Sequence, residues 1–243
     1  PYWHSLRGRM LHDFDCNRED GRCIRVCPRM PTDIKMLLEE FFDPKTVISE
    51  LGPFRGLYLT RAAQPGVRKG SQHGGTATAL MELALREGFI DAAVMIKANG
   101  GLSPTGVLAT TREEIRACRG SSFQIPASLS VLNTALKKGY YKKIGVIGTP
   151  CKTLAVYKMM SRQITEWDNY GDNIGMVFGL FCGWGLDWDG FEKLVFGHVE
   201  RDGIRRIEIP PSKYHCMTIE NNSGITKIDL DEVTPLIRKS CRF

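Results

Sequence analysis

The sequence lacks a long apolar run, because no stretch approaches the roughly 18 to 20 apolar residues that a membrane-spanning helix needs. It also lacks low-complexity tracts and long-period repeats, which excludes disordered and solenoid architectures. No leader peptide is visible, but the first residue is Pro1 and not methionine, so we expect the natural start to lie upstream. With 243 residues, of which 42% are hydrophobic, the chain suits one large or two small globular domains in the cytoplasm.

Several familiar catalytic signatures are absent as well. None of the five histidines lies in a hydrolase-like context, and the zinc-enzyme pattern H-E-x-x-H does not occur. The glycine-rich stretch 70–80 has neither the Gly-Lys-Ser/Thr of a P-loop nor the G-x-G-x-x-G of a dinucleotide fold. The net charge of +6 comes from dispersed basic residues, which favours anionic cofactors mildly and predicts no nucleic-acid partner.

Cysteine, by contrast, is abundant, with eight in the chain. In a secreted protein such a number indicates disulfides, whereas clustered cysteines of a cytosolic protein more often bind metal or react. Because the size, the apolar content and the missing leader indicate the cytosol, we favour metal binding over disulfides. Cys118 and Cys216 stand apart from the others, and we assign them no function.

From residue 56 onward, strand-like and helix-like segments alternate along the chain. This alternation predicts an α/β fold with a mixed, largely parallel sheet and helices on its faces. Period-two alternation on both sides of a turn at 221–224 predicts a C-terminal antiparallel hairpin. The expected strands are 55–62, 91–97, 143–148 and 173–181, and the expected helices are 76–88, 111–118, 128–139 and 152–161.

Residues 1–55 form a separate predicted unit, which is loop-rich or ferredoxin-like, and residues 56–243 form the α/β domain. Within the first unit, the stretch 32–42 predicts a short amphipathic helix with Thr32 as its N-cap. In the helix expected at 76–88, we expect Leu80, Leu83 and Ala84 to form the buried face.

Three cysteines lie where the α/β pattern brings distant segments together. Cys151 follows the strand expected at 143–148, and Cys182 follows the next strand. If these strands are parallel, a right-handed crossover places their carboxyl ends at one edge of the sheet, where α/β proteins bind ligands. Cys241 follows the expected C-terminal hairpin, which we expect to bring the chain back toward the other two cysteines. Three convergent thiolates suit zinc or an iron–sulfur cluster, although a cubane needs a fourth ligand, and each cysteine alone also suits a small buried residue.

A second cysteine set lies within the first 30 residues. Cys23-x3-Cys27-Pro28 matches the second half of the bacterial ferredoxin pattern C-x2-C-x2-C-x3-C-P. The first half departs from it, because Asp20 stands where the second cysteine is expected and Cys16 lies one position too far upstream. Two interpretations stay open, a second cluster held by Cys16, Asp20, Cys23 and Cys27, or an ordinary loop.

Three loops rich in glycine and small polar residues accompany the predicted elements, at 70–80, 99–107 and 118–128. The first loop runs into a helix N-terminus, where free backbone N–H groups and the helix dipole attract anions. The second follows the strand that holds Lys97. Loops of this kind at one sheet edge frame a nucleotide-shaped cofactor.

The motifs join into a recognisable order: "SQHGGTATALMELALREGFIDAAV", "LSPTGVLATTREEI", "RGSSF", "KKIGVIGTPCKTLAVYKM", "GLFCGW" and "IRKSCRF". With these motifs the chain resembles the beta-subunit family of coenzyme-F420-reducing hydrogenase and formate dehydrogenase, which also includes 7-hydroxymethyl-chlorophyll a reductase. The resemblance extends over residues 55–243.

The resemblance implies FAD in the α/β domain and a 4Fe–4S cluster beside it. It assigns the cluster to Cys151, Cys182 and Cys241 and puts the fourth cysteine at position 244, so we expect the natural chain to continue. His73 stands where many members have aspartate, and we expect it to affect the flavin potential or the substrate preference. Some members of the family have an N-terminal ferredoxin-like segment, and this favours a second cluster at the N-terminal cysteines of this chain. The implied cofactor-binding residues are His73, Gly74, Gly75, Thr76, Lys97, Ser103, Pro104, Gly120, Ser121, Ser122 and Thr149.

The function that the resemblance implies is that of an electron-transfer subunit, with electrons passing between an iron–sulfur chain and FAD and, as hydride, to or from coenzyme F420. The expected partners are coenzyme F420 and other subunits of a hydrogenase, formate dehydrogenase or heterodisulfide reductase type of complex. Three alternatives stay open: a reductase of a larger conjugated substrate, a non-catalytic scaffold that retains the fold, and a zinc site.

Overall fold

The protein is represented by a computed structural model that describes residues 2–4, 9–11, 21–43, 47–48, 52–164, 169–210 and 212–241. Its central sheet has four strands in the order β6-β5-β7-β8. Strand β5 pairs in parallel with β7, and β7 with β8, whereas β6 is antiparallel to β5. The mixed, largely parallel sheet that the sequence predicts is therefore confirmed. The strands are β5 (Ala92–Lys97), β6 (Thr105–Ala109), β7 (Ile144–Gly148) and β8 (Ile174–Gly179).

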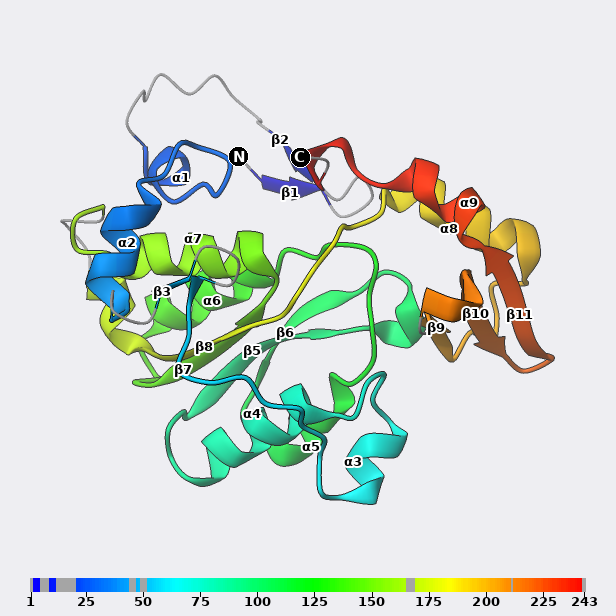
Figure 1. The fold of residues 1–243 in the computed structure, drawn as a ribbon, viewed down its shortest axis with the longest axis horizontal. Coiled ribbons are helices and arrows are strands. Elements are labelled where there is room, and N and C mark those ends of the chain that lie inside the picture. Colours follow the sequence, from blue (N-terminus) through cyan, green and yellow to red (C-terminus); the bar gives the residue numbers. More distant parts are fainter. Residues whose placement is uncertain are drawn as a thin grey trace.

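Helices cover both faces of this sheet (Figure 1). Alternate residues of β5 point to opposite faces, as the strand geometry requires. Ala93 and Met95 pack against α4 and α5, whereas Val94 packs against α6 and α7. The three layers position the carboxyl ends of β5, β7 and β8 at one edge. The helices are α4 (Thr76–Arg86), α5 (Arg112–Ala117), α6 (Ser128–Lys138) and α7 (Pro150–Met160), all close to their predicted bounds.

Local end signals account for these helix boundaries. Thr111 and Glu114 form the capping box at the start of α5, with each side chain bonded to the other residue's backbone. Gly139 ends α6 in the left-handed conformation, at φ 69°. The predicted face of α4 is wrong in part, because Leu80 and Leu83 are each 40% exposed and the buried face consists of Thr78, Met81 and Ala84.

A smaller unit follows the sheet in sequence and has its own core (Figure 1). Its three strands are antiparallel in the order β11-β10-β9, so the predicted hairpin is confirmed. The sequence did not predict the helix α8 that packs on this sheet. The elements are α8 (Trp188–His198), β9 (Arg206–Glu208), β10 (Cys216–Asn221), β11 (Gly224–Asp229) and α9 (Leu230–Val233).

Short elements make up the described part of the N-terminal segment. Helix α2 begins after Asp33, whose carboxylate accepts from the Met36 N–H, so the predicted N-cap Thr32 is off by one residue. Phe41 and Phe42 pack against Tyr157 of α7, with ring centroids 5.2 and 5.5 Å apart. The elements are β1 (Tyr2–His4), β2 (Arg9–Leu11), α1 (Arg22–Arg25), α2 (Ile34–Phe41), β3 (Val47–Ile48), β4 (Gly52–Pro53) and α3 (Pro65–Lys69).

Two further predictions need correction. The strand expected at 55–62 does not form, and its Leu57, Tyr58 and Leu59 side chains are 74%, 83% and 106% exposed. The loop expected at 99–107 contains the start of β6, which pairs with β5. Both errors concern pairing, which the local pattern does not specify. The division of the chain at residue 55 stays a prediction.

Five 3₁₀ turns complete the described elements, and among the described helices none is long and apolar enough to cross a bilayer. The turns are η2 (Asn99–Gly101), η3 (Asn169–Asn173), η4 (Ser212–Tyr214), η5 (Thr234–Leu236) and η6 (Lys239–Cys241).

Candidate functional site

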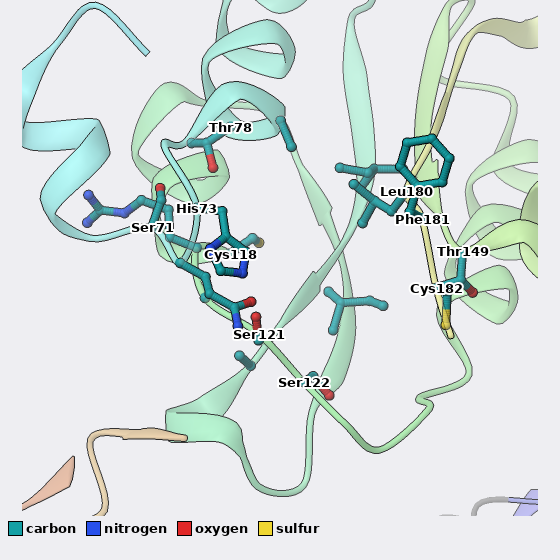
Figure 2. Close-up of a pocket in the computed structure, with 18 of the residues that line it drawn as sticks. Ser71, His73, Thr78, Cys118, Ser121, Ser122, Thr149, Leu180, Phe181 and Cys182 are labelled. Carbon is teal, nitrogen blue, oxygen red and sulfur yellow. The ribbon is translucent and has the colours of Figure 1, made fainter. Parts of the chain in front are cut away.

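A cavity of about 880 Å³ opens at the carboxyl ends of β5, β7 and β8. Its volume lies within the range of ligand and cofactor sites, roughly 300–1,000 Å³. In Figure 2, His73 and Ser121 lie on one wall, and Leu180, Phe181 and Cys182 lie on the opposite wall. Eight of the sequence-predicted residues line the cavity: His73, Gly75, Thr76, Gly120, Ser121, Ser122, Thr149 and Cys182.

The N-terminus of α4 forms one end of the cavity. Gly75 is the N-cap at φ 75°, a left-handed conformation, and it leaves the first turn without a side-chain cap. The first three residues of the helix, Thr76 to Thr78, all line the cavity. Their backbone N–H groups and the positive end of the helix dipole make this turn suited to a phosphate or another anion.

The loop after α5 forms the adjacent wall. Gly120 adopts φ 103°, which favours glycine there. The Arg119 guanidinium donates to the Gly66 and Arg116 carbonyl oxygens, at 2.8 and 2.7 Å, and so ties this loop to the segment before α4. Burial raises the pKa of the Cys118 thiol to about 11, so Cys118 lines the cavity as a neutral, unreactive side chain.

Cys151 and Cys182 lie at the carboxyl ends of two neighbouring strands. Thr149 is the N-cap of α7, Pro150 occupies its first position, and Cys151 follows with an exposed side chain. The Leu180 N–H donates to the Gly148 carbonyl oxygen at 2.8 Å, which extends the β7–β8 pairing up to the cysteines. Because β7 and β8 are parallel, both cysteines emerge at the same sheet edge.

The third cysteine, Cys241, joins them from the 3₁₀ turn η6. The Cys182 side chain is partly open to solvent, yet desolvation raises the pKa of its thiol, and negative charge on Cys151 and Cys241 raises it further. Cys182 therefore lies near both Cys151 and Cys241. Three accessible thiols are a donor set that fits a soft metal ion or an iron–sulfur cluster.

A buried lysine lies directly behind these cysteines. Lys152 is 7% exposed, and its ammonium donates to the Pro126 carbonyl oxygen and the Ser128 hydroxyl, at 3.2 and 2.9 Å. Burial lowers its pKa to about 8, while the thiolate forms of Cys151 and Cys182 oppose this shift. The burial of Lys152 was not predicted from the sequence, because a lysine in a helix ordinarily lies on the solvated face.

The N-terminal cysteine segment lies beside the same helix. Lys158 of α7 donates to the Cys27 carbonyl oxygen at 2.9 Å, and Arg29 donates to the Ser240 carbonyl oxygen at 3.0 Å. Cys23 is exposed and Cys27 is half-buried. Cys16 and Asp20 lie outside the described residues, so the second cluster stays a prediction.

Four of the predicted cofactor-binding residues do not line the cavity. Gly74 accepts from the Ala62 N–H through its carbonyl, and Lys97 is an exposed residue at the end of β5. Pro104 is buried, and Ser103 faces α8, where its hydroxyl donates to Glu192 at 3.1 Å and its N–H donates to Gln124. The β5–β6 pairing folds this loop back toward the smaller unit, which the sequence did not predict.

The apolar part of the cavity wall was not predicted from the sequence. Phe181 is 105% exposed and Leu180 is 39% exposed, and both line the cavity next to Cys182. Leu180 and Phe181 therefore give this end of the cavity an apolar wall that faces solvent. The sequence places both residues at the end of the strand expected at 173–181, whereas β8 ends at Gly179 and leaves them in the loop that follows.

Comparison with known families gives two matches that together cover most of the chain. Both matching models describe parts of the beta subunit of coenzyme F420 hydrogenase/dehydrogenase. The model of its N-terminal part matches residues 57–133, and the model of its C-terminal part matches residues 141–243. The matched ranges contain the cavity and all three of the gathered cysteines.

Individual proteins agree with these family matches. The chain is 32% identical over 177 residues to the coenzyme F420 hydrogenase subunit beta of Methanosarcina barkeri, which covers 70% of this chain and 60% of that protein. It is 23% identical over 195 residues to the coenzyme F420 hydrogenase subunit beta of Methanococcus voltae, which covers 79% of this chain and 68% of that protein.

A solved structure of the F420-reducing [NiFe] hydrogenase complex from Methanosarcina barkeri superimposes with a TM-score of 0.65 at 27% identity. The match covers 74% of this chain and 62% of the chain in that complex. The chain thus spans only about 60% of the length of the first relatives that it matches.

Proposed function

Because the chain belongs to the coenzyme F420 hydrogenase/dehydrogenase beta-subunit family, we propose that it is an electron-transfer subunit that holds FAD and a 4Fe–4S cluster and uses coenzyme F420 as its substrate. Flavin chemistry suits this role, since a flavin exchanges a hydride with one carrier and single electrons with an iron–sulfur centre. The oxidoreductase class follows from the family, whereas the cofactors and the substrate are our proposal.

The observation that supports the proposal most directly is the gathering of three thiols at the rim of the cavity. Cys182 lines the cavity, and its thiol pKa is raised by desolvation and by negative charge on Cys151 and Cys241. These three residues would hold the cluster through sulfur, the donor that iron–sulfur clusters use. Cys151 lies in the first turn of α7, whereas Cys182 follows β8 in a loop and Cys241 lies in the turn η6.

The cavity itself supports a flavin nucleotide. The α4 N-terminus, with Gly75 and Thr76, would accept the diphosphate through backbone N–H groups. The apolar side chains of Leu180 and Phe181 would lie against a planar ring next to Cys182. Gly120 to Ser122 would complete the polar wall. In this arrangement the chain's own residues bind, orient and partly exclude water from the two cofactors.

The named relatives support the choice of substrate and partners. The Methanosarcina barkeri structure is a hydrogenase complex, and the relatives carry subunit names. We propose that this chain likewise works with other subunits that deliver or accept electrons at the cysteine side. The cytoplasmic location stays a prediction.

A visible spectrum of the full-length natural protein, purified without oxygen, tests the proposal. We expect flavin bands and a broad iron–sulfur shoulder that bleaches with dithionite, together with iron and FAD in stoichiometric amounts. F420 reduction, followed at the visible band of the coenzyme, tests the substrate. A colourless, folded protein would instead support the scaffold, and stoichiometric zinc without colour would support a zinc site.

Two outcomes separate the remaining interpretations. Flavin and iron without any F420 activity would favour a reductase of a larger conjugated substrate. Flavin without iron would support the nucleotide cavity as the FAD site and would contradict the assignment of the cysteines to a cluster.

A further inference from the structure

Lys152 is a buried cation with unusual surroundings. Its side chain is 7% exposed, and its two hydrogen-bond acceptors are neutral, the Pro126 carbonyl oxygen and the Ser128 hydroxyl. Among the residues that the structure describes, no carboxylate forms an ion pair with it. Burying a charge without a counter-charge is costly, so the site must gain something from keeping it.

Lys152 lies at the carboxyl end of β7, where the cysteine group emerges, and its Cβ would lie 3.0 Å from a Cβ added at Gly148, the last residue of that strand. Lys152 directly follows Cys151 in α7, and the negative forms of Cys151 and Cys182 both stabilise its ammonium. Its hydrogen bonds fix the Nζ between the start of α7 and the end of the loop at 118–128, whose first half lines the cavity. The cation therefore has one fixed place, beside the cysteine group and behind the cavity wall.

A second buried lysine on the same helix provides a comparison within the molecule. Lys158 is 2% exposed and also donates to one carbonyl oxygen and one hydroxyl, those of Cys27 and Thr32. The cysteine that acts on it electrostatically is Cys27 and not Cys151 or Cys182. Both side chains are buried and donate to the same kinds of acceptor, but the ammonium of Lys152 is the more buried of the two, and the lysines lie near different cysteines.

We propose that Lys152 is a positioning residue whose fixed positive charge offsets the negative charge of the cluster held by Cys151, Cys182 and Cys241 and so raises the reduction potential of that cluster. The inference rests on the proposed function, since it assumes that these cysteines hold iron. Reduction adds one electron to the cluster, and a neighbouring cation stabilises the reduced form more than the oxidised form.

The test is an EPR-monitored redox titration of the full-length protein with dithionite as the reductant. The neutral variant Lys152→Gln retains a hydrogen-bond donor toward Pro126 and Ser128, whereas Lys152→Arg retains the charge. A Cys27→Ser background, which keeps the Cys27 carbonyl, leaves a single cluster signal to follow. At a fixed solution potential, we expect Lys152→Gln to raise the ratio of oxidised to reduced cluster at least tenfold. This corresponds to a midpoint potential lower by about 59 mV for a one-electron couple.

Lys158→Gln is the matched control, and we expect it and Lys152→Arg to leave the midpoint within a threefold change in that ratio. Equal midpoints in Lys152→Gln and in the unsubstituted protein, with full iron content, would overturn the inference while leaving the proposed function intact. No iron in the unsubstituted protein would instead overturn the proposed function.

The variant can also fail to assemble a cluster. If Lys152→Gln folds without iron and Lys152→Arg retains iron, the charge is required for assembly, and the inference is supported. If both variants lose iron, the residue serves packing alone, and the inference is overturned.

Discussion

Replacing Gly75 with alanine perturbs the turn before α4 in two ways. The residue has φ 75°, and a side chain in this left-handed conformation costs about 1–2 kcal/mol. The added Cβ would also lie 3.0 Å from the Ser71 Oγ and 3.1 Å from a Val67 methyl, so these neighbours must shift by a few tenths of an ångström. We therefore expect Gly75→Ala to lower the free energy of unfolding by about 1–2 kcal/mol or slightly more.

The same shift should weaken FAD binding, because it moves the backbone N–H groups that the proposal assigns to the diphosphate. A hydrogen bond to a charged group contributes about 1.5–3 kcal/mol. The loss of one such bond corresponds to a rise in the dissociation constant of roughly tenfold to a hundredfold. FAD binding to the deflavinated protein, measured by quenching of flavin fluorescence, gives this constant directly.

Gly139→Ala supplies the matched control. Gly139 has φ 69° at the end of α6, and no heavy atom lies within 4 Å of the position of an added Cβ. We expect urea denaturation to show a similar loss of about 1–2 kcal/mol with unchanged FAD affinity. If Gly75→Ala also binds FAD as tightly as the unsubstituted protein, the α4 turn is not the phosphate site and this part of the reasoning is wrong.

Three further predictions concern the cysteines, the cavity mouth and acid stability. Cys182→Ser should lose the cluster iron and keep the fold, measured by iron analysis and circular dichroism, whereas Cys216→Ser should keep its iron; the reverse pattern would contradict the site. Phe181→Ala should change the free energy of unfolding by less than about 0.5 kcal/mol, because the ring is exposed. The same variant should raise the KM for F420 or weaken FAD binding, and unchanged values of both would remove Phe181 from the site. Burial raises the pKa of Glu82, but hydrogen bonds from Arg116 and Arg112 outweigh this effect and lower the pKa below the ordinary 4.5. The carboxylate therefore stabilises the fold above that pH and loses its effect as the pH falls through the lowered value. Glu82→Gln should be less stable than the unsubstituted protein at pH 7, and the gap in urea denaturation should shrink below pH 4.5; a constant gap would contradict the assignment.

Much of the fold was predictable from short segments of sequence. The helix starting at Thr111 carries its capping box within four residues, and the helix ending at Gly139 carries its own stop. Apolar runs such as Ile144–Gly148 indicate a strand buried on both faces, which is the case. Strand pairing was less predictable, because the segment 55–62 has strand-like residues but pairs with no strand in the described part of the chain.

The residues of the candidate site also divide into those that could be placed from the sequence and those that could not. Cys151 and Cys182 could be placed together from sequence, since each follows a strand and parallel strands end at one edge. Ser103 could not be placed, because its direction depends on how β6 pairs with β5 and on the position of α8.

The sequence by itself determined the alternation of strands and helices, the helix ends and the edge at which two cysteines emerge, because each of these depends on neighbouring residues and on a handedness that L-amino acids share. The tertiary structure alone decided which lysine is buried beside the cysteines, which loops line the cavity and how Cys241 joins the group. These features arise from contacts between segments far apart in the chain, and the strength of a charge or a hydrogen bond depends on the burial that those contacts create.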